Sequence, residues 1–210
     1  MAVLFDLLYA IYLILYLPVL ILRGKGHGGF VERFGFLSFD LRKALAARRN
    51  IWLHAVSVGE VIAVEGVIRG LKDLFPDKRI VLSVTTKTGY SLARRKYGDD
   101  VLLVWAPLDM RLTTRAFVKA INPLIYIAAE TELWPNLFDC LSENRVPIVV
   151  VNGRISDKAY PGYQLARNIL IATVRRVSLF CMQSPLDAER IVSLGADHIA
   201  QCSEFVGKAD

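Results

Sequence analysis

The feature of this 210-residue chain that most constrains its fold is a regular alternation of short apolar runs with segments of helical periodicity. The apolar runs are continuous rather than alternating, which is typical of strands covered on both faces. Strand and helix alternation on this scale predicts an α/β fold with a doubly wound parallel sheet. We predict strands at 51–57, 79–85, 101–105, 124–129, 147–151 and 177–182, and a weaker one at 198–202. We predict helices at 60–75, 91–97, 111–121, 134–144 and 185–194, with helical sequence from the fifth strand to about residue 176.

The N-terminal segment is strongly apolar. Residues 7–22 carry no charge, and Asp6 is the only charged side chain before Arg23. As a helix, residues 3–22 would cover about 30 Å, which is marginally enough to span a bilayer. A secretory signal fits poorly because no basic stretch precedes the segment and no small-residue cleavage site follows it. We predict a membrane anchor helix at 1–23, with the rest of the chain in the cytoplasm on the side of the basic flank. A helix lying within one leaflet and a buried core helix are the alternatives.

The composition narrows the classes of partner. The net charge is +6, but the basic residues are scattered and form no long tract. Nucleic acid is therefore a weaker prediction than an anionic membrane surface or a phosphorylated substrate. The three cysteines and three histidines lack paired spacing, so the sequence predicts neither a disulfide framework nor a metal site.

In a parallel sheet of this kind, ligands bind beyond the carboxyl ends of the strands. The first strand is followed by His54, Ser57, Gly59 and Glu60, within the motif HAVSVGE. A small residue and a glycine before a helix allow backbone N–H groups to approach a ligand. The motif lacks the Gly-x-Gly-x-x-Gly pattern, so no dinucleotide site is indicated. The alternative is an ordinary tight turn in which Ser57 caps the helix.

Polar loops also follow three later strands. Thr85 opens the hydroxyl-rich loop TTKTGY, which could bind sugar or phosphate oxygens, although a helix cap with a glycine turn is the favoured alternative. Glu130 and Glu132 follow the fourth strand, where their carboxylates could accept hydrogen bonds from sugar hydroxyls. Arg154 follows the fifth strand and could pair with a phosphate or with one of these glutamates.

The loop after the fourth strand has an alternative explanation. In it, Thr131 or Glu132 caps the following helix and Trp134 is a core residue. For Arg154, the alternative is a structural pair with a glutamate.

A glycine-rich stretch, GGFVERFGF, follows the apolar segment and contains Gly28, Gly29, Glu32 and Arg33. It places the carboxylate of Glu32 and the cationic side chain of Arg33 close to the predicted surface of the bilayer. A reactive group at this place could meet a substrate whose polar head is anchored in the membrane. The alternative is a solvated helix face or a capping partner.

These motifs, taken in order, resemble the N-terminal half of the bacterial 3-deoxy-D-manno-octulosonic acid (Kdo) transferases of lipopolysaccharide synthesis. The resemblance covers nearly the whole chain, and its motifs are GGFVERFGF, IWLHAVSVGE, TTKTGY, AETELWPN, NGRISDKAYPGY and QSPLDAERIVSLGA. It implies a GT-B glycosyltransferase built from two Rossmann-like domains. Residues 1–23 would be the anchor, 24–204 the Rossmann-like acceptor-binding domain, and 205–210 the start of the linker to a donor domain.

The resemblance also implies a reaction. Kdo would pass from CMP-Kdo to a lipid A precursor with inversion, without a metal or other cofactor, at the cytoplasmic face of the bacterial inner membrane. Glu32 would be the general base, and Arg33 would keep Glu32 ionised or contact an acceptor phosphate. The other residues implied to bind the acceptor are Gly28, Gly29, His54, Ser57, Gly59, Glu60, Thr85, Glu130, Glu132 and Arg154.

The chain departs from this family in length. Family members are roughly twice as long, and the CMP site is expected in a second domain that this sequence does not contain. The fragment alone is therefore expected to be inactive. Two alternatives remain open: a non-catalytic, membrane-tethered module that binds lipid A, and a GT-B glycosyltransferase for another lipid-linked acceptor.

Overall fold

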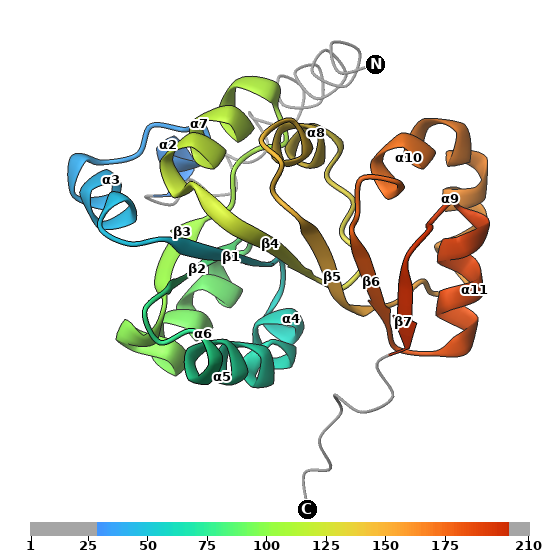
Figure 1. Cartoon of the computed structure of the whole chain (residues 1–210), viewed down its shortest axis with the longest axis horizontal. Helices are drawn as coiled ribbons and strands as arrows, with labels where there is room; N and C mark the ends of the chain where they lie inside the picture. Colours follow the sequence, from blue (N-terminus) through green and yellow to red (C-terminus); the bar gives the residue numbers. More distant parts are fainter. Residues whose placement is uncertain (1–28, 202–210) are drawn as a thin grey trace, which may run out of the picture.

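The computed structural model describes residues 29–201. These residues form one seven-stranded sheet in which every strand is parallel to its neighbours, in the order β3-β2-β1-β4-β5-β6-β7 (Figure 1). The predicted doubly wound parallel sheet is confirmed. The strands are β1 (Asn50–Ala55), β2 (Arg79–Val84), β3 (Leu102–Trp105), β4 (Pro123–Ala129), β5 (Ile148–Gly153), β6 (Leu179–Met182) and β7 (Ile199–Gln201).

The helices after β1 begin and end close to the predicted places, with two corrections given below, whereas α2 and α3 are not among the predicted helices. They are α2 (Phe30–Arg33), α3 (Phe39–Ala46), α4 (Val58–Ala63), α5 (Glu65–Leu74), α6 (Lys87–Tyr97), α7 (Arg111–Ile121), α8 (Pro135–Glu143), α9 (Tyr160–Leu165), α10 (Arg167–Val174) and α11 (Pro185–Ser193), with a 3-10 turn at Gly98–Asp100. No helix within residues 29–201 has the length and apolar character needed to cross a bilayer. The predicted membrane anchor, Gly28 and the predicted linker lie outside the described residues.

The single helix predicted at 60–75 is wrong, because the structure has α4 and α5 with a break at Val64. Val61, Val64 and Ile68 are all buried in the same apolar cluster. This apolar stripe continues across the break, so the periodicity of the sequence does not reveal it. The start of the next helix is also corrected, from residue 91 to Lys87, because the Thr86 side chain accepts a hydrogen bond from the Gly89 N–H at 3.2 Å.

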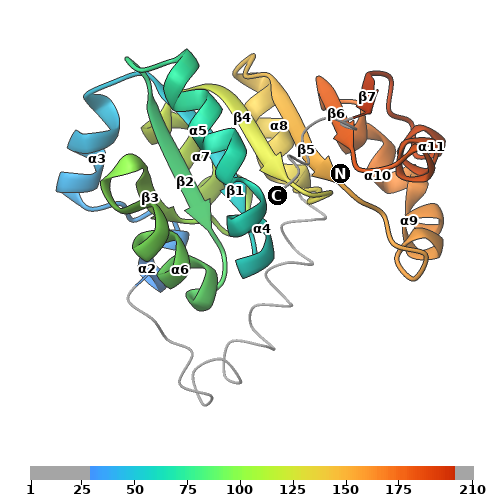
Figure 2. The ribbon, with the colours of Figure 1, turned by 90° about the horizontal axis from the view of Figure 1, so that it is seen from below.

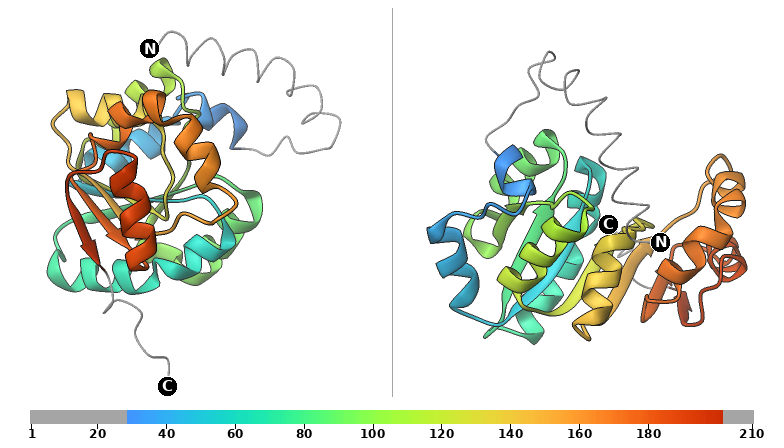
Figure 3. Two further views of the ribbon diagram at one scale, coloured as in Figure 1. Left: turned by 90° about the vertical axis from the view of Figure 1, so that its right-hand side faces the viewer. Right: turned by 90° about the horizontal axis from the view of Figure 1, so that it is seen from above.

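Two apolar layers cover the sheet. Helices α4, α5 and α6 pack on one face, where Leu53 and Leu82 are fully buried. Helices α3, α7 and α8 pack on the other face, where Trp52, Phe117 and Phe138 are fully buried. Figures 2 and 3 show that α9, α10 and α11 gather near β6 and β7, at the opposite end of the sheet from α2 and α3. The double coverage explains why the strands are continuous apolar runs.

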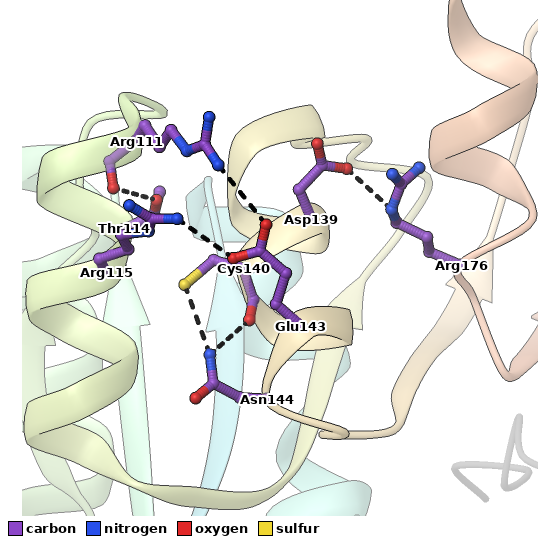
Figure 4. A network of polar contacts seen from close by, with 8 residues as sticks. All are labelled: Arg111, Thr114, Arg115, Asp139, Cys140, Glu143, Asn144 and Arg176. Carbon is purple, nitrogen blue, oxygen red and sulfur yellow. Dashed lines mark hydrogen bonds and ion pairs between the residues drawn. The ribbon is translucent and has the colours of Figure 1, made fainter. Parts of the chain in front are cut away.

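Helix α8 is held to its neighbours by ion pairs on its outer surface (Figure 4). Glu143 lies between Arg111 and Arg115 of α7, at 3.6 and 3.4 Å, and Asp139 pairs with Arg176 at 2.8 Å. These side chains are partly exposed, so each pair is worth less than about 1 kcal/mol.

The other end of α8 has a stronger support. Trp134 occupies the N-cap position and makes no side-chain cap. The cap comes instead from Asp109, whose carboxylate accepts hydrogen bonds from the backbone N–H groups of Asn136 at 3.2 Å and Leu137 at 2.8 Å, 27 and 28 residues later in the chain. The Asn136 side chain returns a bond to the Asp109 carbonyl at 2.7 Å. The capping role suggested for Thr131 or Glu132 is therefore wrong.

Replacing Asp109 by alanine should cost about 2 kcal/mol or more of the free energy of unfolding, because two buried N–H groups lose a charged acceptor. Asp139→Ala, which removes a surface ion pair from the same helix, is the control and should cost less than about 1 kcal/mol. Urea unfolding followed by circular dichroism measures both. Equal losses for the two variants would contradict the capping role.

Candidate functional site

The order of the strands reverses between β1 and β4, and the residues that follow these two strands meet at one edge of the sheet. At this switch point, parallel sheets leave a crevice for ligands. Strands β1 and β4 pair directly, with His54 opposite Ala128. The loop after β1 carries Ser57 and leads to Glu60, and the loop after β4 carries Glu130 and Glu132. Pairing of the strands brings these two loops together.

The short helix α2 is fastened to the carboxyl end of β3. The Glu32 carboxylate accepts a hydrogen bond from the Trp105 backbone N–H at 2.7 Å through Oε1. Arg33 donates through Nε to the Ala106 carbonyl at 3.0 Å, and its own carbonyl accepts from the Leu108 N–H at 3.0 Å. These bonds hold Glu32 and Arg33 at the same edge of the sheet as the two loops.

A glycine allows this close approach. A Cβ atom built on Gly29 would lie 2.0 Å from the Trp105 ring, a distance at which no side chain fits. The Trp105 ring stacks in turn on Tyr90, with centroids 4.1 Å apart and an interplanar angle of 6°. Gly59 is different, because a Cβ there would meet only Ser57 Oγ at 3.8 Å. Gly59 is therefore not required by close approach of the backbone.

Glu32 lies in a partly desolvated position. Burial raises the pKa of its carboxyl, and the hydrogen bond from Trp105 offsets part of this rise. The negative charge of Glu32 contributes to a raised pKa of Tyr90, after burial, which places the two side chains near each other. Oε2 of Glu32 makes no hydrogen bond to any residue in 29–201. One oxygen is thus anchored, and the other is available to accept a proton.

Ser57 and Glu60 form a capping box at the start of α4. Ser57 Oγ accepts from the Glu60 N–H at 3.4 Å, and the Glu60 carboxylate accepts from the N–H groups of Val56 and Ser57 at 2.7 and 3.1 Å. The capping alternative for Ser57 is confirmed. Burial raises the pKa of Glu60, these hydrogen bonds oppose the rise, and the charge of Glu130 adds to it. Both carboxylate oxygens of Glu60 are engaged by the backbone.

His54 lies almost entirely inside the protein. It is 1% exposed, and its Nδ1 lies 2.8 Å from Ser83 Oγ, which also accepts a bond from the Trp52 indole at 2.8 Å. Burial, followed by the charge of Arg33, lowers the pKa of His54 to about 3. The ring is therefore neutral at physiological pH. Its Nε2 makes no hydrogen bond to the described residues.

Glu130 and Glu132 are placed by an unusual backbone conformation. Glu130 has a φ of +59°, in the left-handed region that disfavours residues other than glycine. Its N–H donates to the Val151 carbonyl at 2.8 Å, and its carbonyl accepts from the Glu132 N–H at 3.0 Å. Burial, and then the charges of Glu60 and Glu130, raise the pKa of Glu132 to about 7. The nearby Trp134 indole N–H lowers this pKa slightly without completing a hydrogen bond of good geometry.

Arg154 and Thr85 are the two remaining predicted site residues. The Arg154 side chain is exposed and makes no ion pair with Glu130 or Glu132 in the described structure, so the structural Arg–Glu pair is wrong. Its backbone N–H donates to Thr131 Oγ1 at 2.9 Å. Thr85 lies after β2, and its buried hydroxyl makes no hydrogen bond within residues 29–201.

Sequence reasoning missed three residues of this region, namely Tyr90, Trp105 and Tyr126. Trp105 ends a predicted strand, so its place at the strand end could have singled it out. Tyr126 lies in the middle of β4 and gives no such signal. The histidine, cysteine and acidic side chains of residues 29–201 do not gather into groups of three that could hold a metal ion.

The raised pKa of Glu132 generates a stability prediction. Between about pH 4.5 and 7, this carboxyl is ionised in the unfolded chain but still protonated in the folded protein. The folded state therefore binds more protons, and the contribution of Glu132 to stability falls as the pH rises through this window. Glu132→Gln should raise Tm by about 2–4 °C relative to the wild type at pH 8 and leave it nearly unchanged at pH 4.5.

Thermal unfolding at a series of pH values measures this difference. Glu143→Gln is the control, because it makes the same chemical change in the surface ion pairs with Arg111 and Arg115. The Tm of this control variant should not exceed that of the wild type at any pH between 4.5 and 8. A Glu132→Gln curve parallel to the wild-type curve would show that the carboxyl titrates normally.

Comparison with known proteins supplies a family for this geometry. Residues 28–205 match the family described as 3-deoxy-D-manno-octulosonic-acid transferase (kdotransferase). A bifunctional glycosyltransferase/methyltransferase of Fusobacterium nucleatum is 40% identical over 148 residues, which are 70% of this chain and 23% of that protein. The 3-deoxy-D-manno-octulosonic acid transferase of Haemophilus influenzae is 32% identical over 164 residues, which are 78% of this chain and 38% of that protein. The chain thus spans less than half the length of these curated relatives.

A solved structure shares the fold. It is described as a putative UDP-N-acetylglucosamine 2-epimerase from Listeria monocytogenes, and it superposes with a TM-score of 0.52 at 11% identity. The match covers 73% of this chain and 44% of that chain, as expected for one half of a GT-B-like fold. The family match extends over all of the described residues. This chain therefore belongs to the 3-deoxy-D-manno-octulosonic acid transferase family, of which it contains the N-terminal domain.

Proposed function

We propose that this chain is the acceptor-binding half of an enzyme that transfers Kdo from CMP-Kdo to a lipid A precursor, with inversion at the anomeric carbon. Membership of the family supports the reaction class. The donor would bind in a second domain, so the activity is that of a full-length protein with both halves. Residues 1–23 would anchor this protein at the cytoplasmic face of the bacterial inner membrane.

The placement of Glu32 is the observation that carries the proposal. A general base needs a carboxylate within reach of the acceptor hydroxyl and a pKa closer to neutral than usual. Glu32 has one oxygen fixed by the Trp105 N–H at 2.7 Å, the other available, and a pKa raised by burial. It also lies at the carboxyl end of β3, on the edge of the sheet that carries the loops after β1 and β4.

In the proposed reaction, the acceptor hydroxyl oxygen attacks the anomeric carbon of Kdo as the bond from that carbon to the CMP phosphate breaks. The hydroxyl proton passes to Oε2 of Glu32, and CMP leaves with the bonding electron pair. The partly desolvated position of Glu32 strengthens its basicity relative to an exposed carboxylate. Arg33, which is fixed to the Ala106 carbonyl beside the site, is a proposed contact for an acceptor phosphate.

Replacement of Glu32 by glutamine in the full-length protein tests the role of the base. Glutamine keeps an oxygen that can accept the Trp105 N–H, so the fold and acceptor affinity should be retained. The kcat with CMP-Kdo and a lipid A precursor should fall about 10²–10⁴-fold, because the proton acceptor is lost. Glu143→Gln, on the far end of α8, is the control and should keep the wild-type kcat.

A kcat of Glu32→Gln within about threefold of the wild type would remove Glu32 from the mechanism. A wild-type protein that binds the acceptor but transfers no sugar from CMP-Kdo would instead favour a binding module. Transfer from a different nucleotide-sugar would point to another glycosyltransferase with the same acceptor half.

A further inference from the structure

A cavity lies at the amino edge of the sheet, opposite the edge that carries Glu32. It is formed where β1, β4 and β5 begin, and its volume is about 580 Å³, which is within the range of small-molecule sites. Asn50 begins β1 and Pro123 begins β4, and these two residues are paired in the register. Glu32, by contrast, is bonded to Trp105 at the carboxyl end of β3. The cavity is therefore separate from the candidate site described above.

Four cationic side chains line this cavity. Arg49 directly precedes β1, Arg115 and Lys119 lie on α7, and Arg145 follows the end of α8. None of the aspartates and glutamates in the described part of the chain is among the lining residues. The fold thus brings four like charges from distant parts of the sequence to one concave surface. Such a surface focuses the electric field and attracts ions of opposite charge.

Three of the four cations have no partner of opposite charge. The Arg115 guanidinium lies 3.4 Å from the Glu143 carboxylate, and Figure 4 shows it turned toward that residue. The side chains of Arg49, Lys119 and Arg145 are exposed and take part in no ion pair within residues 29–201. Their mutual repulsion is therefore not relieved by the described residues.

A simpler role for these cations would be to cap the carboxyl ends of α7 and α8. Carbonyls at both ends already have other donors. The Asn144 side chain donates to the Cys140 carbonyl at 2.7 Å (Figure 4), and the last carbonyl of α7, that of Ile121, accepts from a buried asparagine side chain. Arg145 contributes its backbone N–H, which donates to the Ser142 carbonyl at 2.9 Å.

The magnitude of the helix dipoles leads to the same conclusion. Each helix carboxyl end carries about half a unit of negative charge, so the two ends together supply about one unit. Arg49, Lys119 and Arg145 supply three positive charges that have no carboxylate partner. A surplus of about two positive charges remains at the cavity. The surplus matches a ligand with two negative charges.

The rest of the lining narrows the ligand further. The base of the cavity is apolar, with the buried side chains of Val118, Cys140 and Val146. Burial, and then the charge of Glu143, raise the pKa of the Cys140 thiol to about 11, so the thiol adds no negative charge at neutral pH. The described lining residues include no aromatic side chain on which a nucleobase would stack. Guanidinium groups bind phosphate oxygens through paired hydrogen bonds, which favours phosphate among the divalent anions.

We propose that Arg49, Lys119 and Arg145 form a second ligand site, which takes the phosphate or diphosphate group of a small molecule without an aromatic base. The site lies at the edge of the sheet opposite Glu32, so its ligand is not the acceptor of the proposed reaction. The inference does not rest on the proposed function.

Isothermal titration of the full-length protein with inorganic pyrophosphate, at fixed ionic strength and with saturating CMP to fill the proposed donor site, tests this assignment. Arg145→Gln and Lys119→Gln should each weaken the affinity about tenfold, because each removes one charged donor to the anion. Arg145→Lys keeps the charge and should bind with an affinity between those of the wild type and Arg145→Gln. All three side chains replaced are exposed, so the Tm of these variants should stay close to that of the wild type.

Arg95→Gln is the matched control. Arg95 is also exposed and without an ion pair in the described structure, but it lies on α6, which packs on the other face of the sheet. The control makes the same change of net charge and should leave the affinity for pyrophosphate unchanged. Succinate, a divalent anion without phosphorus, should bind the wild type at least tenfold more weakly than pyrophosphate.

Two further ligands identify the source of the phosphate. Glycerol 3-phosphate represents a free phosphate ester, and dihexanoyl phosphatidic acid, used below its micelle concentration, represents a lipid head group. Equal affinities that fall in Arg145→Gln would support a free ester, and a tighter lipid that is weakened by the same variant would support a head group.

Several results would overturn the proposal: no binding of pyrophosphate by the wild type at millimolar concentration, an equal loss of affinity in Arg95→Gln, or succinate binding as tightly as pyrophosphate. A single-stranded RNA that binds more tightly than pyrophosphate, and is weakened by Arg145→Gln but not by Arg95→Gln, would assign the cavity to nucleic acid instead.

Discussion

The direct parallel pairing of β1 with β4 is the constraint on which the described structure depends. Because the strand order runs outward from this pair in both directions, the loops after β1 and β4 lie side by side at the edge of the sheet and lead to helices on its opposite faces, α4 on one and α8 on the other. The pair is anchored inside by Trp52 and Tyr126, which lie opposite each other in the register with ring centroids 5.1 Å apart. The same register brings the capping box of Ser57 and Glu60 next to Glu130 and Glu132.

Electrostatics at this edge follow from burial. The carboxyls of Glu32, Glu60 and Glu132 all have a raised pKa, and in each case burial is the largest cause. Their local partners differ. The carboxylates of Glu32 and Glu60 accept hydrogen bonds from backbone N–H groups, whereas that of Glu132 has only the nearby Trp134 indole. Perturbed carboxyls concentrated at a switch point are typical of functional sites, and this supports the proposed assignments.

The elements of the fold could be predicted well from the sequence, because apolar runs and helical periodicity are local signals. Strand β4 was predicted to within one residue and α7 to the residue. The break at Val64 was missed because the apolar stripe is continuous across it. The role of Ser57 as a cap was among the predicted alternatives, since the capping box lies within four consecutive residues.

Contacts between distant residues could not be predicted in the same way. The bond from Trp105 to Glu32 joins residues 73 apart, and the cap that Asp109 provides for α8 reaches 28 residues along the chain. The predicted pair between Arg154 and a glutamate is wrong for the same reason. Closeness at a sheet edge does not fix the direction of a long side chain. Tyr126 was missed because a tyrosine inside a strand looks like any other core aromatic.

The sequence by itself determined the succession of strands and helices along the chain, the burial of both sheet faces, the motifs at the strand ends and the resemblance to the family. These properties depend on residue type and spacing, which are local. Only the tertiary structure decided which loops meet, which backbone N–H holds Glu32, and how far burial and neighbouring charges shift the pKa of Glu132. Those properties depend on distances between residues that the chain brings together only when the sheet closes around β1 and β4.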